Sequence, residues 1–222
     1  MWKENDNVYM KTVKGPLRVD CIYRRLDDSF LDPKAFNKDS LIGVPGLFKC
    51  WLKKNVGILN AVGTGVADDK VVYSYVNKMI TYYLGEQPIL DQVETYLCHD
   101  ETHKKYVIEN ISKLVVKPAN ASGGYGIMIG PKAPKKEIEE TIIKIKKNPR
   151  EYIAQPLEIL STAPTITEHD IEPRHLDLRP FVLTGKSNYV TSGGLTRVAL
   201  RKGSTIVNSS QGGGSKDTLI VD

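Results

Sequence analysis

The sequence predicts an α+β protein in which mixed and antiparallel sheets are flanked by helices. Short β-branched runs recur along the chain, and several in the second half are joined by turns rich in glycine and serine. Two other stretches repeat apolar residues at helical spacing. The 222 residues are enough for one large domain or two small ones.

The composition is that of an ordinary globular protein, with 41% hydrophobic and 26% charged residues. No apolar run approaches the roughly 18 residues of a membrane span. The N-terminal stretch MWKENDNVYMK lacks the apolar core of a signal peptide, so we expect a cytoplasmic protein without membrane partners. The net charge of +5 suits an anionic small ligand as well as it suits nucleic acid.

The cysteines and histidines do not predict a metal centre. Cys21, Cys50 and Cys98 are odd in number and form no CxxC pair, so we expect reduced, partly buried thiols. His99 and His103 have the spacing of metal ligands on a helix, but no third ligand accompanies them. We therefore interpret both as solvent-facing helix residues.

The strongest helix prediction in the first half covers residues 70–84. Asp68 or Asp69 would cap its start and Gly85 would end it. A short strand and a second helix, beginning at about Glu101, follow. The first helix is predicted from apolar residues at helical spacing, namely Val72, Val76, Met79, Ile80, Tyr83 and Leu84.

The second half predicts strands, one amphipathic helix and glycine turns. The helix covers residues 135–148, with Ile138, Ile142 and Ile145 on one face. Residues 176–200 predict two or three strands, with turns at Thr184-Gly185-Lys186 and Ser192-Gly193-Gly194. Residues 205–210 predict another strand, followed by a glycine loop at 211–217.

The stretch SKLVVKPANASGGYGIMIG combines two requirements of a polyphosphate site. Lys117 ends a predicted strand and can supply a fixed cation, and glycines let backbone N–H groups approach phosphate oxygens. The P-loop pattern GxxxxGK[ST] is not met by GYGIMIGPK or by GGGSKDT. The dinucleotide fingerprint does not fit either, because its glycines should open a helix and here they lead into a second strand. An ordinary β-hairpin turn remains the alternative. The predicted hairpin contains Ser122, Gly123, Gly124, Tyr125 and Gly126.

The lysines of the 135–148 helix raise a second possibility, a nucleic-acid surface. No aromatic residues interleave with them for base stacking, and three glutamates dilute the charge. A solvated helix face is the better interpretation, which makes nucleic acid an unlikely partner.

The order of these elements resembles the nucleotide-binding half of ATP-grasp enzymes: a strand ending in Val-Lys-Pro, a glycine hairpin, an amphipathic helix and the strand YIAQP. Together with VYMKTVKGPLRVDCIYRRLDDSFLDP, SLIGVPGL, NAVGTGV, STAPTI and LDLRPFVLTG, the chain resembles circularly permuted ATP-grasp type 2 proteins, relatives of glutathionylspermidine synthetase. The resemblance covers nearly the whole chain. It implies an ATP-grasp-like fold, ATP and Mg²⁺ as cofactors, and ligation of a carboxylate to an amine through an acyl-phosphate, giving an amide or peptide bond.

The resemblance also implies roles for nucleotide-binding residues. Lys117 would contact the α- and β-phosphates, and Lys70 would be the second nucleotide lysine. The hairpin from Ser122 to Gly126 would cover the β- and γ-phosphates. Gln155 would lie at the hinge against adenine, although an ordinary edge-strand role remains open for it.

A second group of residues would line the reaction centre. The resemblance implies that Arg179 and Arg197 hold the carboxylate and its acyl-phosphate. Asn208 and the backbone of Gly212 and Gly213 would line the same centre. The alternatives are surface ion pairs for the two arginines and a turn-forming role for Asn208.

The resemblance implies three parts: residues 1–109 as the N-terminal α/β portion, 110–175 as the nucleotide-binding subdomain and 176–222 as the catalytic-core strands.

Family members are longer and carry a Glu-x-Asn element that ligates magnesium. This element has no counterpart in this sequence, so the metal ligands are unknown. We expect an N-terminally incomplete, C-terminal portion of the permuted fold: a fragment, a split protein or a degenerate relative. Its partners would be carboxylate and amine substrates, as small molecules or peptides, and the remaining ATP-grasp portion or another chain. The alternative is a non-catalytic nucleotide-binding or partner-binding fragment.

Overall fold

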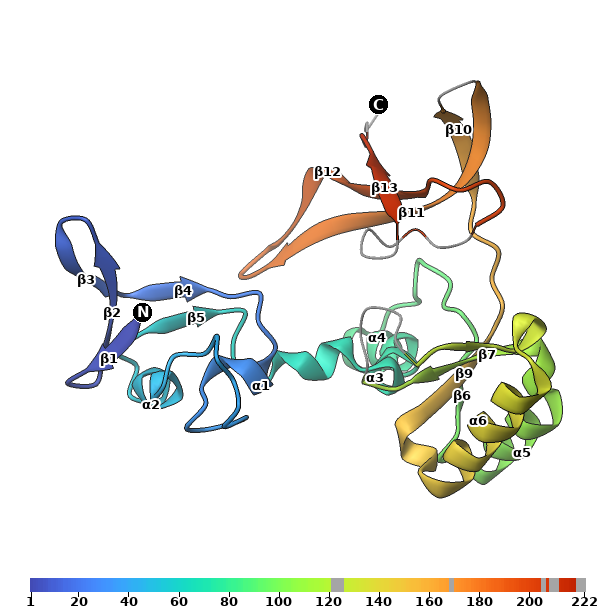
Figure 1. Cartoon of the computed structure of the whole chain (residues 1–222), viewed down its shortest axis with the longest axis horizontal. Coiled ribbons are helices and arrows are strands. Elements are labelled where there is room, and N and C mark those ends of the chain that lie inside the picture. Colours follow the sequence, from blue (N-terminus) through green and yellow to red (C-terminus); the bar gives the residue numbers. More distant parts are fainter. Residues whose placement is uncertain (121–125, 168–169, 205–206, 208–211, 219–222) are drawn as a thin grey trace. The chain divides into compact units, whose positions relative to one another are not determined.

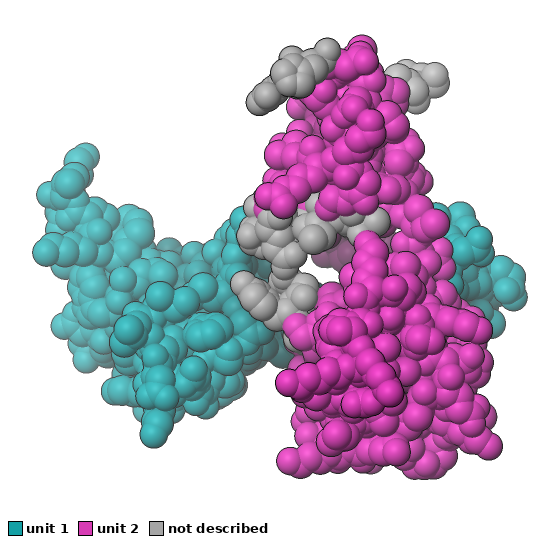
Figure 2. All heavy atoms as spheres, turned by 45° about the vertical axis from the view of Figure 1, so that its right-hand side comes forward, with its two compact units in different colours: residues 1–92 teal, residues 93–222 magenta. Residues whose placement is uncertain are grey.

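The computed structural model of the chain describes residues 1–120, 126–167, 170–204, 207 and 212–218. The chain forms two compact units, Met1–Gln92 and Val93–Asp222, which Figure 2 colours teal and magenta. The division at 92/93 lies upstream of the expected boundary at residue 109, which falls near the end of a helix. The three-part functional division stays a prediction.

Unit 1 combines two small sheets with short helices (Figure 1). Three antiparallel strands form one sheet, and two parallel strands form the other. The strands are β1 (Trp2–Glu4), β2 (Asn7–Thr12), β3 (Gly15–Val19), β4 (Cys21–Tyr23) and β5 (Gly57–Leu59). The helices are α1 (Asp28–Leu31), α2 (Leu47–Leu52), η1 (Thr64–Asp68), α3 (Lys70–Tyr73) and α4 (Val76–Leu84).

The core of unit 1 gathers apolar side chains from β2, α1, α2 and β5, including Val8, Leu47 and Ile58. Asp32 is buried beside it, and its carboxylate accepts hydrogen bonds from the backbone N–H groups of Gly46 and Phe48, both at 2.9 Å. These bonds satisfy N–H groups at the start of α2 that have no intrahelical partner.

The helix expected over residues 70–84 begins and ends as predicted but is interrupted. Asp69 caps α3 by accepting a hydrogen bond from Val71 N at 2.7 Å, and Gly85 ends α4 in the left-handed region. Between them, the N–H groups of Ser74 and Tyr75 bond to carbonyls three residues back instead of four. The interruption coincides with β-branched and aromatic residues, which lose rotamer freedom in a helix.

The first sheet of unit 2 has the strand order β6-β9-β7-β8, with antiparallel pairing throughout. Its strands are β6 (Tyr96–Leu97), β7 (Leu114–Pro118), β8 (Met128–Ile129) and β9 (Tyr152–Pro156). The accompanying helices are α5 (Glu101–Asn110), η2 (Ile111–Lys113), η3 (Gly130–Lys132), α6 (Lys135–Lys147) and η4 (Pro149–Glu151). The helices predicted near Glu101 and over 135–148 are therefore confirmed.

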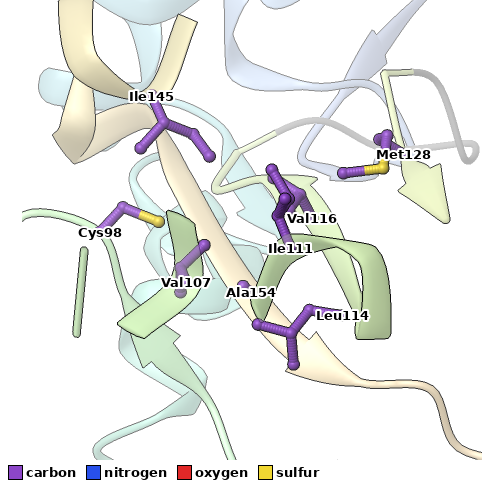
Figure 3. Close-up of a cluster of buried hydrophobic side chains, with 8 residues drawn as sticks. All are labelled: Cys98, Val107, Ile111, Leu114, Val116, Met128, Ile145 and Ala154. Carbon is purple, nitrogen blue, oxygen red and sulfur yellow. The ribbon is translucent and has the colours of Figure 1, made fainter. Parts of the chain in front are cut away.

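Helices α5 and α6 cover one face of this sheet (Figure 1). Alternate strand residues, which point to the same face, meet Val107 of α5 and Ile145 of α6 in a buried cluster (Figure 3). Ile138 and Ile142 pack against this cluster, as the helical periodicity predicts. The strand residues of the cluster are Leu114, Val116, Met128 and Ala154.

The second sheet of unit 2 is an antiparallel succession of β10 (Thr162–Ile166), β11 (Ile171–Thr184), β12 (Asn188–Ala199) and β13 (Gly213–Lys216). Residues 171–199 form two strands. The turn expected near residue 185 joins them, but the turn expected at Ser192-Gly193-Gly194 is wrong. Those residues continue β12 beside a bulge, and Gly194 pairs with Pro180.

The glycine loop predicted at 211–217 is also wrong at residues 213–216. Gly213–Lys216 form β13, in which Gly213 pairs with Ala199 and Ser215 pairs with Arg197. Pairing with β12 supplies partners for the backbone groups, which offsets the low strand propensity of glycine. Most of the strand predicted at 205–210 lies outside the described residues.

The remaining broad expectations concern membranes and cysteines. None of the described helices is long and apolar enough to cross a membrane. All three cysteines are free, with Cys50 and Cys98 buried and Cys21 exposed. The combination of helices and antiparallel sheets confirms the α+β class.

Candidate functional site

Lys117 and Gln155 meet on neighbouring strands of the first sheet of unit 2. Lys117 lies opposite Ile153 and Gln155 lies opposite Val115, so both side chains occupy the face turned away from α5 and α6. The Lys117 ammonium donates a hydrogen bond from Nζ to Gln155 Oε1 at 2.7 Å. Gln155 is buried and Lys117 half-buried, so a cation lies at the end of β7 in a partly desolvated place.

The amide of Gln155 also donates a hydrogen bond from Nε2 to Thr95 Oγ1 at 2.8 Å. Thr95 in turn donates its hydroxyl hydrogen to the carbonyl of Val93 at 2.9 Å. Hydrogen bonds thereby link the side chains of Lys117, Gln155 and Thr95, which come from separate parts of unit 2. The sequence offered no signal for Thr95, because it precedes a two-residue strand without any motif.

Gly126 is the one member of the predicted phosphate hairpin within the described residues; Ser122, Gly123, Gly124 and Tyr125 lie outside them. Its φ is +72°, a left-handed conformation that favours glycine. A Cβ atom at this position would lie 3.0 Å from Cγ of Pro118. The returning arm of the hairpin therefore approaches the residue that directly follows Lys117.

Lys70 lies in unit 1, at the first position of α3. Burial lowers the pKa of its ammonium below the ordinary lysine value, while the neighbouring Asp69 carboxylate opposes this shift. The proposed nucleotide role of Lys70 stays a prediction.

Arg179 and Arg197 lie on one face of the second sheet of unit 2. Asp177 and Arg197 are cross-strand partners on β11 and β12, and Arg179 follows two residues after Asp177. Arg179 donates from Nε at 3.1 Å and from Nη2 at 2.9 Å to Oδ2 of Asp177. Asp177 thus orients the half-exposed Arg179 guanidinium, and the Asp-x-Arg spacing is its sequence signal, since residues i and i+2 share a strand face.

The other residues expected at the reaction centre are only partly placed. Asn208 lies outside the described residues. Gly212 has a left-handed φ of +84°, and Gly213 begins β13. Gly213 therefore belongs to the same sheet as Arg179 and Arg197.

The magnesium ion that the resemblance implies has no matching ligand set in the described part of the chain. Within it, no group of three or more His, Cys, Asp or Glu residues could hold a metal ion. His103 Nδ1 accepts a hydrogen bond from Leu97 N at 3.2 Å, and His99 is exposed but precedes α5. The expectation of two solvent-facing helix histidines is therefore wrong.

Comparison with known proteins finds relatives along nearly the whole chain. A family model described as circularly permuted ATP-grasp type 2 matches residues 1–199. An uncharacterized Synechocystis protein is 55% identical over 213 residues, which cover 96% of this chain and 44% of the relative. An uncharacterized Mycobacterium tuberculosis protein is 50% identical over 218 residues, with 98% and 40% covered.

A Frankia casuarinae protein named "Putative glutamate--cysteine ligase 2-2" is 48% identical over 217 residues, which cover 98% of this chain and 25% of that protein. The chain therefore spans less than half the length of each of these three relatives.

Proposed function

The chain belongs to the circularly permuted ATP-grasp type 2 family, and on this premise we propose that it carries the nucleotide-binding part of an ATP-dependent carboxylate–amine ligase. A carboxylate oxygen attacks the γ-phosphorus of ATP, and ADP leaves. The amine nitrogen then attacks the acyl-phosphate carbonyl, loses a proton, and phosphate leaves as the amide forms. The printed name of the Frankia relative supports ligase chemistry.

The observation that carries this proposal is the Lys117–Gln155 pair, together with the approach of Gly126 to the following residue, Pro118. Phosphoryl transfer is catalysed mainly by positioning the reactants and by offsetting charge. A half-buried ammonium held 2.7 Å from a buried amide oxygen is a cation in a defined place, which a polyphosphate needs. Lys70 would add a second cation, and residues 122–126 would cover the phosphates.

The proposed reaction centre uses Arg179, Arg197, Asn208 and the backbone at Gly212 and Gly213. A guanidinium binds carboxylate or phosphate through a planar fork of N–H groups, so two arginines on one sheet face suit an acyl-phosphate. Asp177 would orient Arg179 for this purpose.

The family generally uses ATP and a divalent metal ion. The described residues do not assemble a carboxylate cluster for Mg²⁺, so no step here depends on a particular ligand to it. Because the chain matches 44% or less of the length of these relatives, we propose turnover for a protein of their length. For this chain we propose nucleotide binding, with carboxylate and amine substrates as partners of the longer protein.

A thermal-shift titration with MgATP tests the nucleotide site. The comparison is between the unmodified chain, Lys117→Met, and the control Lys136→Met, which removes an exposed lysine from α6. ATP at ~100 times its dissociation constant stabilises a binding protein by about 2.7 kcal/mol. We expect this gain in the unmodified chain and in Lys136→Met, and its loss in Lys117→Met.

Two outcomes would contradict the nucleotide site: no gain in the folded, unmodified chain, or an equal gain in all three proteins. The ligase chemistry has its own readout, which is ADP release from MgATP with glutamate and cysteine as the probe carboxylate and amine. ADP release that depends on both amino acids supports a ligase. ATP binding without it favours a non-catalytic nucleotide-binding fragment.

A further inference from the structure

We propose that Thr95 is a positioning residue for Lys117, acting through the side-chain amide of Gln155. The inference rests on the proposed function, because it takes Lys117 as the cation that meets the phosphates. No sequence motif marks Thr95, and its role emerges from two hydrogen bonds of Gln155, to Lys117 and to Thr95, at 2.7 and 2.8 Å.

The strand pairing explains why Thr95 reaches this site. Tyr96 pairs with Ala154 in the antiparallel β6–β9 ladder, and residues 95 and 155 continue the same register. Gln155 also pairs with Val115 of β7, two residues before Lys117. The three side chains therefore lie on one face, across three adjacent strands or their extensions.

The hydrogen-bond directions permit one orientation of the Gln155 amide. An ammonium group only donates, so Oε1 of Gln155 must face Lys117. Nε2 then donates to Thr95, whose own hydrogen is committed to the Val93 carbonyl at 2.9 Å. In the flipped amide, an NH₂ group would face the ammonium and the acceptor would be lost. Thr95 thus selects the orientation that presents an acceptor to Lys117.

The burial of Gln155 makes the orientation of its amide depend more strongly on Thr95. Gln155 is 7% exposed, so water has little access to replace a lost partner of its amide. A lysine side chain has many rotamers, and an acceptor that holds its ammonium lowers the entropy lost when a phosphate binds. The expected consequence of losing the Thr95 hydroxyl is a weaker contact between Lys117 and the polyphosphate.

The first test measures coupling without any nucleotide. Thr95→Val removes the hydroxyl at nearly constant volume, and Thr95→Ser keeps it. The unmodified chain, Thr95→Val, Lys117→Met and the double variant form a double-mutant cycle. The change in the unfolding equilibrium constant of the double variant should differ at least about twofold from the product of the two single changes. The matched control is Thr141→Val on α6, whose hydroxyl donates to Glu137 O at 2.8 Å and which should be additive with Lys117→Met.

The second test compares ATP with adenosine by calorimetry on the folded variants. Thr95→Val should weaken ATP binding about fivefold more than it weakens adenosine binding, the loss of one net hydrogen bond, because only ATP carries the phosphates that Lys117 would meet. Thr95→Ser should restore ATP binding, and Thr141→Val should not alter it.

The outcomes separate this inference from the proposed function. An additive Thr95–Lys117 cycle would overturn the inference while leaving ATP binding intact. A coupled cycle with unchanged ATP affinity in Thr95→Val, or Thr95→Ser behaving as Thr95→Val, would also overturn it. If the unmodified chain binds no ATP, the proposed function fails and the nucleotide role of Thr95 with it, even where the cycle is coupled.

Discussion

Nζ of Lys117 lies 2.7 Å from Oε1 of Gln155, although 38 residues separate the two along the chain. The contact exists because β7 and β9 are adjacent in the sheet, with Lys117 diagonal to Gln155 on one face. A buried amide thus holds a lysine ammonium at a strand end, and the effects of changing this pair can be measured separately from any reaction.

Replacing Gln155 by methionine should lower the free energy of unfolding by about 1–3 kcal/mol. The change keeps the side-chain length but removes an acceptor of the Lys117 ammonium and the donor to Thr95. Urea denaturation measures the difference. The control Gln87→Met alters an exposed residue of unit 1 and should stay within ~0.5 kcal/mol of the unmodified chain. Equal stability of Gln155→Met would argue against a structural role for the amide.

Gly126→Ala should destabilise the chain more than Gly203→Ala does. The two glycines have nearly equal left-handed φ values, +72° and +71°, so both substitutions carry a backbone cost of about 1–2 kcal/mol. At Gly126 the new Cβ would also lie 3.0 Å from Cγ of Pro118, whereas at Gly203 it meets nothing within 4 Å. We expect a further ~1 kcal/mol at Gly126 from overpacking. Thermal unfolding of both variants measures it, and equal losses would refute the close approach.

Gly194→Ala and Gly193→Ala test the continuity of β12, where a turn was expected. A Cβ at Gly194 would lie 3.0 Å from the backbone oxygen of Arg179, and a Cβ at Gly193 would meet nothing within 4 Å. We expect a loss of about 1–3 kcal/mol for Gly194→Ala and little change, or a gain below ~1 kcal/mol, for Gly193→Ala. Chemical denaturation distinguishes the two. If Gly193→Ala is the more damaging variant, the strand pairing is not as described.

The thiols should react in two classes. Burial raises the pKa of Cys98 to about 11, and burial also raises that of Cys50, whereas Cys21 is exposed. Because the thiolate is the reactive form, a disulfide reagent at pH 8 should modify one thiol quickly in the folded chain and the other two after unfolding. Cys21→Ser should remove the fast phase, and a fast phase of two or more thiols would contradict the assignment.

The raised Cys98 pKa also has a consequence for stability. The unfolded thiol ionises near ~8.5, whereas the folded thiol stays neutral until about 11. The stability from burying the neutral thiol is therefore complete below pH ~8.5 and is lost as the pH rises through about 11. Urea denaturation of the unmodified chain and of Cys98→Ala between pH 8 and pH 11 should show a steeper loss in the unmodified chain. Parallel curves would contradict this linkage.

Local features of the sequence predicted much of the fold. Helix α6 follows from its apolar spacing, and α5 begins at Glu101 as expected, where the structure shows Asp100 as its cap. The interruption at Ser74 was missed, because the cap at Asp69 and the stop at Gly85 are equally consistent with one helix or two. Glycine clusters misled the prediction at Gly193–Gly194 and Gly213–Gly214, where cross-strand pairing overrides turn propensity.

The candidate site, like the fold, was predicted from the sequence only in part. The sequence alone determined that Lys117 ends a strand before a glycine-rich stretch, and resemblance added Gln155, Arg179 and Arg197 as candidates. Only the tertiary structure decided that Lys117 bonds to Gln155, that Thr95 completes the link, and that Asp177 orients Arg179. The reason is physical: propensity and capping act over a few residues, whereas strand register brings together side chains whose separation in sequence no local pattern records.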